Sequence, residues 1–453
     1  MNLPRLIARL CLGRRLPKVD GDLAVSGLSG PVSLRRDAAG VLYVDAQTGE
    51  DAWFGLGFGH GQDRAGQLEV IIRLLRGTLA EVLGADGLPM DLLTRRLQVH
   101  HAGASQYAVA EPEVRRQFDA YAAGINAAYA SMPGRPSHEH VLLGCEGTRW
   151  RGEDCQTFAA YLCFMLAANW DIELLRLRVL EADGPEAVKA LDPLYPSWLP
   201  SVMGDAQADV GALDRLAGDL TALTSLVGLG GGSNAWALSP SRTASGRPIL
   251  ANDPHLIPSA PSQWYLARLS TPNWKVAGGS FVGTAAMGSG HNEHLAWGVT
   301  AGHADHTDLF LEKVSDDGTC VLDNGAWVPC EVREEVIGVK GREAVTERVL
   351  MTPRGPLVGQ SFAGQGVAMS LAGTWLAPRP YSGIFSVHRA ATMAEVSAMF
   401  EQASTTNVGL VYAHRDGDIG YLLAADIPVR GKGSGLVPAP GWLPEYAWEA
   451  EPL

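Results

Sequence analysis

The sequence predicts an α+β protein in which a mainly helical first half precedes a strand-rich second half. The first observation is a change of apolar period: helical spacing dominates residues 88–200, whereas short alternating runs with turn residues follow Ser233. The second is a small, acidic, aromatic-poor segment between these halves. We therefore expect a helical region at 1–200, a spacer at 201–232 and a strand-rich region at 233–453.

The composition sets limits on the partners. A net charge of -13 argues against nucleic acid or an anionic membrane, because both require a basic face. The longest apolar run, Phe158–Ala168, is shorter than the roughly 20 residues that span a bilayer. Arginines interrupt Met1–Lys18, so no apolar signal-peptide core is visible. We expect a cytoplasmic protein with neither nucleic-acid nor membrane partners.

Three long stretches of the first half have helical spacing. Asp51–Gly84 carries apolar residues at a 3.6 period, and Gly84 suits a helix C-cap. Its glycine-rich beginning is the weakest part of that prediction. Glu111–Met132 and Glu153–Ala182 are each expected to form one helix.

Turn residues predict two hairpins. Residues 31–44 alternate in polarity around Ala39-Gly40, and Asn324-Gly325 lies between Cys320 and Cys330. Whether these two cysteines pair is open. Further short strands are expected over Trp236–Leu238, Pro248–Leu250, Leu295–Val299, Leu309–Leu311 and Gly409–Tyr412.

Ser233 follows three glycines and is the candidate nucleophile. The GxSxG elbow is absent, since Ala235 replaces its last glycine. An N-terminal serine could instead use its own α-amine, whose pKa near ~8 suits a general base. That route requires cleavage of the Gly232–Ser233 bond, and Gly232 permits the strained backbone that cleavage needs.

Several motifs occur in the order found in one enzyme family. Gly232-Ser233-Asn234-Ala235-Trp236 and Ile249–Leu256 resemble the start of the β subunit of the penicillin acylase family of N-terminal-nucleophile hydrolases. Upstream and downstream stretches fit the same pattern: Leu16–Gly21, Val32–Asp37, Gly57–Arg64, Gly77–Gly84, Gly290–Thr300 and Asp305–Leu309. The resemblance runs from about residue 16 to the end of the chain.

The resemblance implies an αββα sandwich, here with an incomplete sheet, and hydrolysis of a small N-acyl substrate at a linear amide bond. Self-cleavage at Gly232–Ser233 would yield an α/β heterodimer from a zymogen, as in antibiotic-processing acylases. Ser233 would be nucleophile and α-amino base, the Ala301 N–H an oxyanion donor, and His255 a neighbour of the nucleophile. The family is often periplasmic, in contrast to the location expected from the N-terminus.

Other residues are assigned through the same resemblance. Glu173, Asp305, Thr307 and Asp308 would hold a structural calcium ion, whose preference for oxygen ligands they satisfy. A solvated acidic loop is the alternative. Trp170 and Leu256 would line the acyl pocket, although core packing explains both equally well, and His255 could be an ordinary turn histidine.

Two alternatives to an active acylase remain at this stage. In complete family members, a segment after the one matched here supplies an oxyanion asparagine and an arginine, and we expect both beyond Leu453. The chain could therefore be an inactive remnant that needs a missing C-terminal portion. A zinc hydrolase is also conceivable, because His291, His294, His303, Asp305 and His306 are close in sequence, but their spacing matches no zinc motif. The acyl group itself is not readable.

Overall fold

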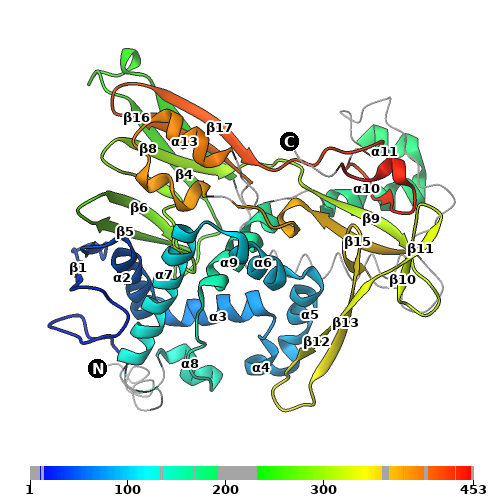
Figure 1. The fold of residues 1–453 in the computed structure, drawn as a ribbon, viewed down its shortest axis with the longest axis horizontal. Helices are drawn as coiled ribbons and strands as arrows, with labels where there is room; N and C mark the ends of the chain where they lie inside the picture. Colours follow the sequence, from blue (N-terminus) through cyan, green and yellow to red (C-terminus); the bar gives the residue numbers. More distant parts are fainter. Residues whose placement is uncertain are drawn as a thin grey trace.

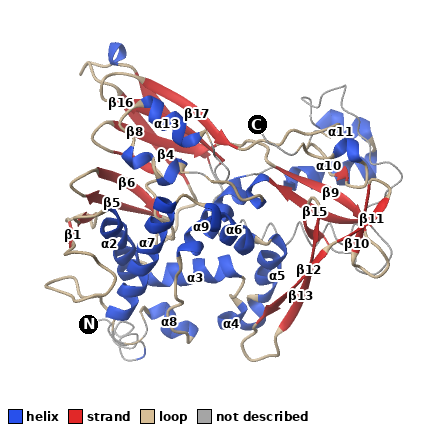
Figure 2. Cartoon of the chain, viewed as in Figure 1, coloured by secondary structure: helices blue, strands red, loops and turns tan. Residues whose placement is uncertain are grey.

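A computed structural model describes residue 11 and residues 15–132, 134, 136–166, 170–191, 232–359, 367–380, 382–401, 407–433 and 435–449. Most helices of the first half lie in the centre and below, between two separate sheets, whereas the last two lie beside the second sheet (Figure 1). Colouring by secondary structure shows the same division (Figure 2). The expected α+β organisation is confirmed, with a mainly helical first region and a strand-rich region after residue 232. The predicted spacer lies almost entirely outside the described residues.

The helices follow one another along the first half, with one more near the end. Their bounds are α2 Gly49–Asp63, α3 Ala65–Arg76, α4 Ala80–Leu83, α5 Leu88–Leu97, α6 Val99–Val109, α7 Pro112–Ser131, α8 His138–Leu143, α9 Gly152–Leu166, α10 Trp170–Asp183, α11 Pro185–Leu191 and α13 Met393–Phe400.

The larger sheet has eight strands in the order β1-β2-β5-β6-β7-β8-β16-β17. All its pairings are antiparallel except β2 with β5, which are parallel. The strands are β1 Ser33–Arg36, β2 Leu42–Asp45, β5 Trp264–Ser270, β6 Lys275–Phe281, β7 Ser289–His291, β8 Leu295–Ala301, β16 Asn407–His414 and β17 Ile419–Ala425. The sheet therefore combines a hairpin of the first half with six strands of the second.

A second sheet of six strands has the order β12-β13-β14-β15-β9-β18, and a hairpin, β10–β11, stands beside it. Their bounds are β9 Thr307–Lys313, β10 Cys320–Asp323, β11 Ala326–Pro329, β12 Glu331–Ile337, β13 Val345–Thr352, β14 Gly355–Gly359, β15 Val367–Gly373 and β18 Ala439–Pro440. β12 and β13 form a long arm that reaches toward α4 and α5 (Figure 1).

Glycines allow α2 to pack unusually close to its neighbours. A Cβ on Gly57 would lie 2.1 Å from the Tyr121 carbonyl oxygen of α7, and one on Gly59 would lie 2.4 Å from Leu42 of β2. The glycine-rich start that weakened the helix prediction is thus helical because it is buried between α7 and the sheet. Close backbone approach is what glycine provides here.

The continuous helix predicted over Asp51–Gly84 is wrong in one respect, because the segment is three helices. Arg64, at φ −135°, separates α2 from α3, and Gly77, at φ +60°, ends α3. Gly84 caps α4 as expected, with φ +68°. The helix predicted over Glu111–Met132 is confirmed by α7, and α9 and α10 account for the described parts of Glu153–Ala182.

Both predicted hairpins are confirmed. β1 and β2 pair antiparallel across Gly40, and β10 and β11 pair across Asn324-Gly325, whose φ angles are both positive. Cys320 and Cys330 are free thiols. The other strands expected in the second half are present as β3, β4, β8, β9 and β16.

The hairpin that carries Ser233 forms its own two-stranded sheet. β3 (Gly232–Leu238) and β4 (Ile249–His255) pair antiparallel and pack on β8 and β16. Helices α2 and α7 cover the other face of the eight-stranded sheet, since buried residues of β5 and β8 join their core. The described residues thus contain a helix layer, an eight-stranded sheet and a two-stranded sheet on the other face of that sheet.

By length and apolar composition alone, one stretch, Gly152–Asp183, of which all but residues 167–169 are described, could cross a membrane, and 60% of its most apolar window is buried inside the protein. A core helix of a globular protein passes the same test, so this stretch carries no membrane assignment.

Candidate active site

A cavity of about 430 Å³ opens between α9, the β3–β4 hairpin and the end of β8. Ser233, Leu256 and Ala301, three of the residues singled out from the sequence, line it together. Most of the remaining wall is apolar: Phe158, Leu162, Met165, Leu166, Trp264, Phe281, Val299, Ile384, Phe385 and Val408. The cavity therefore places Ser233, the candidate nucleophile, beside a wall suited to an apolar group.

Ser233 is half-buried near the start of β3, opposite Pro254 of β4. Gly232 lies opposite His255, and the His255 Nδ1 is 3.9 Å from the position of a Cβ on Gly232. The exposed His255 ring contacts Asp253 through Nε2, with 2.7 Å to Oδ2, and this contact lowers the pKa of Asp253. His255 thus lies beside the Gly232–Ser233 bond, but it is not among the residues lining the cavity.

The backbone of Ala301 is oriented by pairing at the end of β8. Val408 of β16 is its partner in register, and the next residue, Gly302, donates its N–H to the Asn407 carbonyl at 2.9 Å. Alternate residues of an antiparallel ladder point their N–H groups to opposite sides. The Ala301 N–H therefore points away from β16, which is the orientation a donor to a bound oxyanion needs.

Asn407 fixes the turn that follows Ala301. Its buried side chain accepts from the Ala304 N–H at 3.1 Å and donates to the Ala304 carbonyl at 2.8 Å. Within this turn His303 has φ +52°, a left-handed conformation that is uncommon outside glycine. Two side-chain hydrogen bonds thus hold a strained turn next to the candidate oxyanion donor.

Asn252 connects the β3–β4 hairpin, which carries Ser233, to β8. Its Nδ2 donates to the Asn234 carbonyl and to the Val299 carbonyl, each at 2.9 Å. Its Oδ1 accepts from Ser289 Oγ at 2.6 Å. Gly298 makes room for it, because a Cβ there would lie 2.5 Å from the Asn252 Cβ.

Sequence reasoning missed the roles of Asn252 and Asn407. Asn252 lies inside a quoted motif, but nothing in the sequence places its amide between two sheets. Asn407 is more than 100 residues from the turn it holds, so no local signal could have found it. Phe158 and Leu162 lie within the apolar run of α9, and such a run does not by itself distinguish the wall of a cavity from a packed core.

Trp170 lies away from the cavity lining. It is 7% exposed at the start of α10 and stacks on Phe164 with ring centroids 6.2 Å apart. Both rings belong to the hydrophobic core between the central helices and β9. Leu256, in contrast, lines the cavity at the end of β4.

The predicted calcium ligands lie near one another around Arg430. Its Nη2 contacts Asp305 Oδ1 at 2.9 Å and Asp308 Oδ1 at 2.8 Å. Glu173 is fully buried and accepts from the Leu309 N–H at 3.1 Å, and its other oxygen is buried without a partner in the described structure. Burial raises the pKa of Glu173 well above its ordinary value, and Asp308 raises it further. Thr307, also buried, begins β9 beside Asp308.

The residues of the zinc alternative do not converge. His303 lines the cavity, whereas buried His306 faces Cys163, with Nε2 3.2 Å from the Cys163 carbonyl oxygen. His291 and His294 are exposed on and after β7. Within the described ranges, three side chains with metal-binding atoms come together elsewhere, at His100, His101 and Glu335.

The profile of the penicillin amidase family matches residues 31–452. The chain belongs to this family. It is 31% identical to the acyl-homoserine lactone acylase QuiP of Pseudomonas fluorescens Pf-5, over 97% of this chain and 55% of that protein. It is also 31% identical to the penicillin acylase 2 proenzyme of Pseudomonas sp. SE83, over 99% of this chain and 59% of that protein.

The chain therefore spans about half the length of these penicillin amidase relatives. Among solved structures, the thermostable penicillin G acylase from Alcaligenes faecalis in orthorhombic form is 25% identical, with a TM-score of 0.42 over 48% of this chain and 40% of that one. The recognition made from the sequence motifs is confirmed by the family match.

Proposed function

We propose that the protein is an amidohydrolase that cuts its own chain between Gly232 and Ser233 and then uses Ser233 to hydrolyse a linear N-acyl amide. The observation that carries this proposal is the shared cavity of Ser233 and Ala301. It presents a hydroxyl and, from the end of β8, a backbone N–H turned away from its strand partner. Relatives named acyl-homoserine lactone acylase and penicillin acylase support the hydrolysis of an N-acyl amide.

The first step creates the base. Ser233 Oγ attacks the Gly232 carbonyl carbon, the peptide bond breaks as an ester forms, and water hydrolyses that ester. The new Ser233 α-amine, with a pKa near ~8, then accepts the hydroxyl proton during attack on a substrate amide. It passes the proton to the leaving amine, and a second water releases the acid. Donation from the Ala301 N–H would stabilise each tetrahedral oxyanion.

The wall of the cavity supports an apolar acyl group. Phe158, Leu162 and Phe281 also border a second cavity of about 680 Å³ between α3, α8 and residues 257–263. An acyl chain directed from Ser233 toward these three side chains would be removed from water along its length. Together with the acyl-homoserine lactone acylases among the relatives, this favours N-acyl-homoserine lactones over smaller amides.

We propose further that Glu173, Asp305 and Asp308 bind a calcium ion, with a carbonyl oxygen of Thr307 as another ligand. The fit rests on the unpartnered buried oxygen of Glu173 close to two more carboxylates. The calcium ion would neutralise the carboxylates and would connect Glu173 of α10 to Asp308 of β9. Arg430 already contacts both aspartates, so the ion would compete with this guanidinium.

Mass spectrometry of the purified 453-residue chain tests the cleavage. We expect two fragments, the second beginning at Ser233, and release of amine from N-acyl-homoserine lactones. Ser233→Ala should remain one chain and be inactive. Ser245 is an exposed serine in the connection between β3 and β4, and Ser245→Ala should behave like the native chain. An intact native chain without amide hydrolysis after long incubation would overturn the proposal.

One observation favours the alternative of an inactive remnant that needs a further portion. Alternate residues of β5 and β17 expose apolar side chains on the face that carries β3 and β4; Leu266 is 57% and Tyr421 is 65% exposed. The same mass measurement decides between the two proposals. Cleavage at Ser233 requires an assembled site, and a permanently intact chain with native helix content indicates the remnant.

A further inference from the structure

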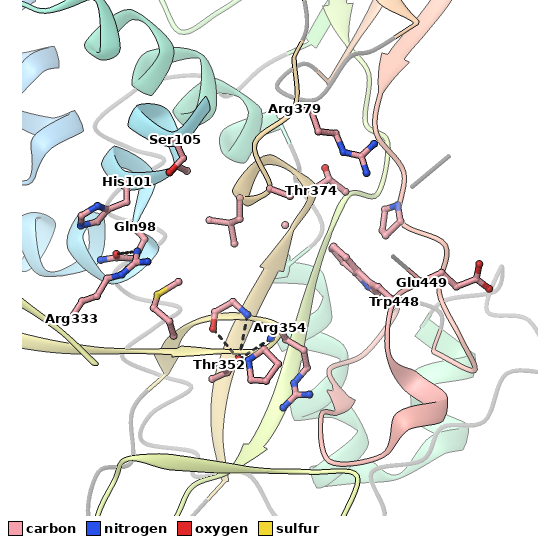
Figure 3. Close-up of a pocket in the computed structure, with 18 residues that line it drawn as sticks. Gln98, His101, Ser105, Arg333, Thr352, Arg354, Thr374, Arg379, Trp448 and Glu449 are labelled. Atoms are coloured by element: carbon pink, nitrogen blue, oxygen red, sulfur yellow. Dashed lines mark hydrogen bonds between the residues drawn. The ribbon is translucent and has the colours of Figure 1, made fainter. Parts of the chain in front are cut away.

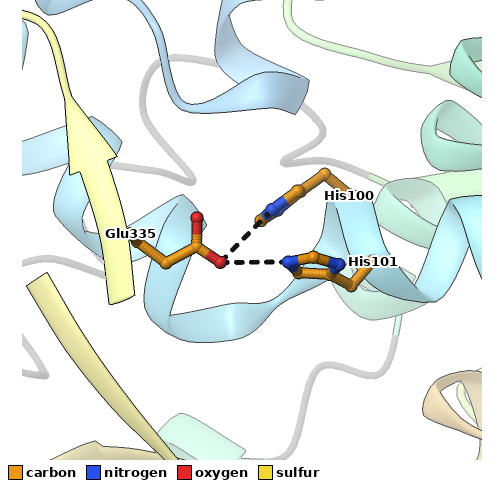
Figure 4. Close-up of side chains that lie close together, drawn as sticks. All are labelled: His100, His101 and Glu335. Carbon is orange, nitrogen blue, oxygen red and sulfur yellow. Dashed lines mark hydrogen bonds and ion pairs between the residues drawn. The ribbon is translucent and has the colours of Figure 1, made fainter. Parts of the chain in front are cut away.

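Two adjacent histidines and a glutamate meet outside the candidate active site. α5 ends at Leu97, and Gln98, in a left-handed conformation with φ +56°, redirects the chain into α6. His100 and His101 therefore occupy the first turn of α6 and face Glu335 of β12 (Figure 4). Two imidazoles and a carboxylate therefore lie close together where the helical half contacts the β12–β13 arm.

The three candidate ligand atoms lie close enough together to surround one metal ion. Glu335 Oε1 is 3.5 Å from His100 Nε2 and 3.0 Å from His101 Nε2. All three atoms lie within 4.8 Å of one another. Tetrahedral zinc, with ligand bonds of about 2.0–2.1 Å, places its ligands about 3.3 Å apart. The two measured distances lie on either side of that value.

The surroundings already orient these ligands. Arg95 donates to the other oxygen of Glu335, Oε2, at 2.6 Å and leaves Oε1 directed at the histidines. Gln98 Nε2 also contacts Oε1, at 3.0 Å. The Nδ1 of His100 is buried without a partner in the described structure, so Nε2 is the atom through which this ring acts. A fixed outer contact such as the one from Arg95 is typical of a ligating carboxylate.

One side of the cluster is open. His101 is 47% exposed, and with Gln98 it lines a cavity of about 360 Å³ that Arg333 and Thr352 also border (Figure 3). A fourth ligand, such as water, can therefore reach the metal from this cavity. Three protein ligands and one open position are the usual arrangement of a reactive or exchangeable zinc site.

We propose that His100, His101 and Glu335 form a binding site for a divalent transition metal, with zinc as the best match to two imidazole nitrogens and one carboxylate oxygen. The ion would join α6 to β12. His101 precedes the Gly232–Ser233 bond in the sequence and Glu335 follows it. If the chain were cut there, the metal would therefore still connect the two fragments. The site is independent of the proposed hydrolysis.

Cobalt titration tests the site. The Ser233→Ala chain, stripped with chelator and kept reduced, is titrated with Co²⁺ and then with Zn²⁺, so that failure of self-cleavage cannot affect the result. We expect one equivalent of Co²⁺ with the strong visible bands of four-coordinate nitrogen–oxygen ligation, displaced by Zn²⁺. His101→Ala and Glu335→Gln should each weaken binding by about tenfold or more, since even outer contacts change metal affinity by 10–100-fold.

His291→Ala removes an exposed histidine elsewhere and is the matched control, expected to bind like its parent. Thermal melting of each variant without metal shows whether it is folded. Absence of one-equivalent binding in the parent chain, or equal affinity in the parent, His101→Ala and Glu335→Gln, would overturn the proposal. Sulfur-to-cobalt charge-transfer absorption would likewise overturn it, because it would place the ion at cysteine.

Discussion

At the scale of single residues, the side-chain amide of Asn252 holds the β3–β4 hairpin, which carries Ser233, against β8. Asn252→Ala removes two donors and one acceptor, at roughly 1 kcal/mol for each hydrogen bond. Because Asn234 and Val299 flank Ser233 and Ala301 in sequence, we expect self-cleavage to slow by about tenfold or more, which corresponds to about 1.4 kcal/mol. Fragment formation followed by mass spectrometry measures this.

Asn273→Ala is the control for that change, since Asn273 is an exposed loop residue and should cleave at the native rate. If Asn252→Ala and Asn273→Ala were cleaved equally fast, Asn252 would have no positioning role. A lower melting temperature with unchanged cleavage would make it a stability residue instead.

The raised pKa of Glu173 gives the proposed calcium site a pH dependence. Burial and Asp308 favour the protonated form, whereas calcium requires the carboxylate. Binding should therefore release a proton, and affinity should rise with pH. Calorimetry in buffers of different ionisation enthalpy measures the released proton. Glu173→Gln should abolish this proton release, whereas Glu186→Gln, which changes an exposed side chain, should leave it unchanged. A calcium affinity that does not depend on pH would contradict the assignment.

At the scale of elements, the contact between α2 and α7 depends on missing side chains. Gly→Ala usually favours a helix by up to about 1 kcal/mol. Gly57→Ala should instead lower the free energy of unfolding, because the new Cβ would lie 2.1 Å from the Tyr121 carbonyl oxygen. We expect a loss of about 1–3 kcal/mol or more, as overpacking produces, measured by denaturant unfolding. Gly30→Ala has open space around it and should be nearly neutral; equal effects would refute the close contact.

A hairpin, a helix break and a buried asparagine show what could and could not be predicted from the sequence. The hairpin at Asn324-Gly325 was predictable because its turn residues determine the backbone locally. The break at Arg64 was not, because apolar spacing continues across it and Arg64 carries no turn signal. Asn407 shows a second limit. Its contact with the Ala301 turn arises only when β16 pairs with β8, a tertiary event that no local pattern records.

At the scale of the whole molecule, one face of the eight-stranded sheet exposes several large apolar side chains. Leu266, Tyr421 and Leu423 expose 57%, 65% and 42% of their surface, and they alternate with residues buried against the helices. We expect this chain to bind the dye ANS while its helices remain folded by circular dichroism. Tyr421→Lys should reduce dye fluorescence, because it removes apolar area from this face.

Leu142→Lys is the matched control for the dye experiment, since Leu142 is 71% exposed but lies on α8, away from this face. A dye signal that fell equally in both variants, or was absent from the native chain, would show that the face is not an accessible apolar surface.

The parallel pairing of β2 with β5 has a consequence for the order of events in biosynthesis. These strands come from opposite sides of the Gly232–Ser233 bond, so a cut there would leave a single sheet shared by two polypeptides. In one polypeptide the strands meet at an effective concentration in the millimolar range for a short flexible tether, and the 218 residues between them, 46 to 263, lower this only gradually. Two released fragments would have to meet at their much lower cellular concentrations. Folding before cutting therefore turns a bimolecular encounter into an intramolecular one, and dilution after the cut becomes a measurable determinant of how long the two fragments stay together.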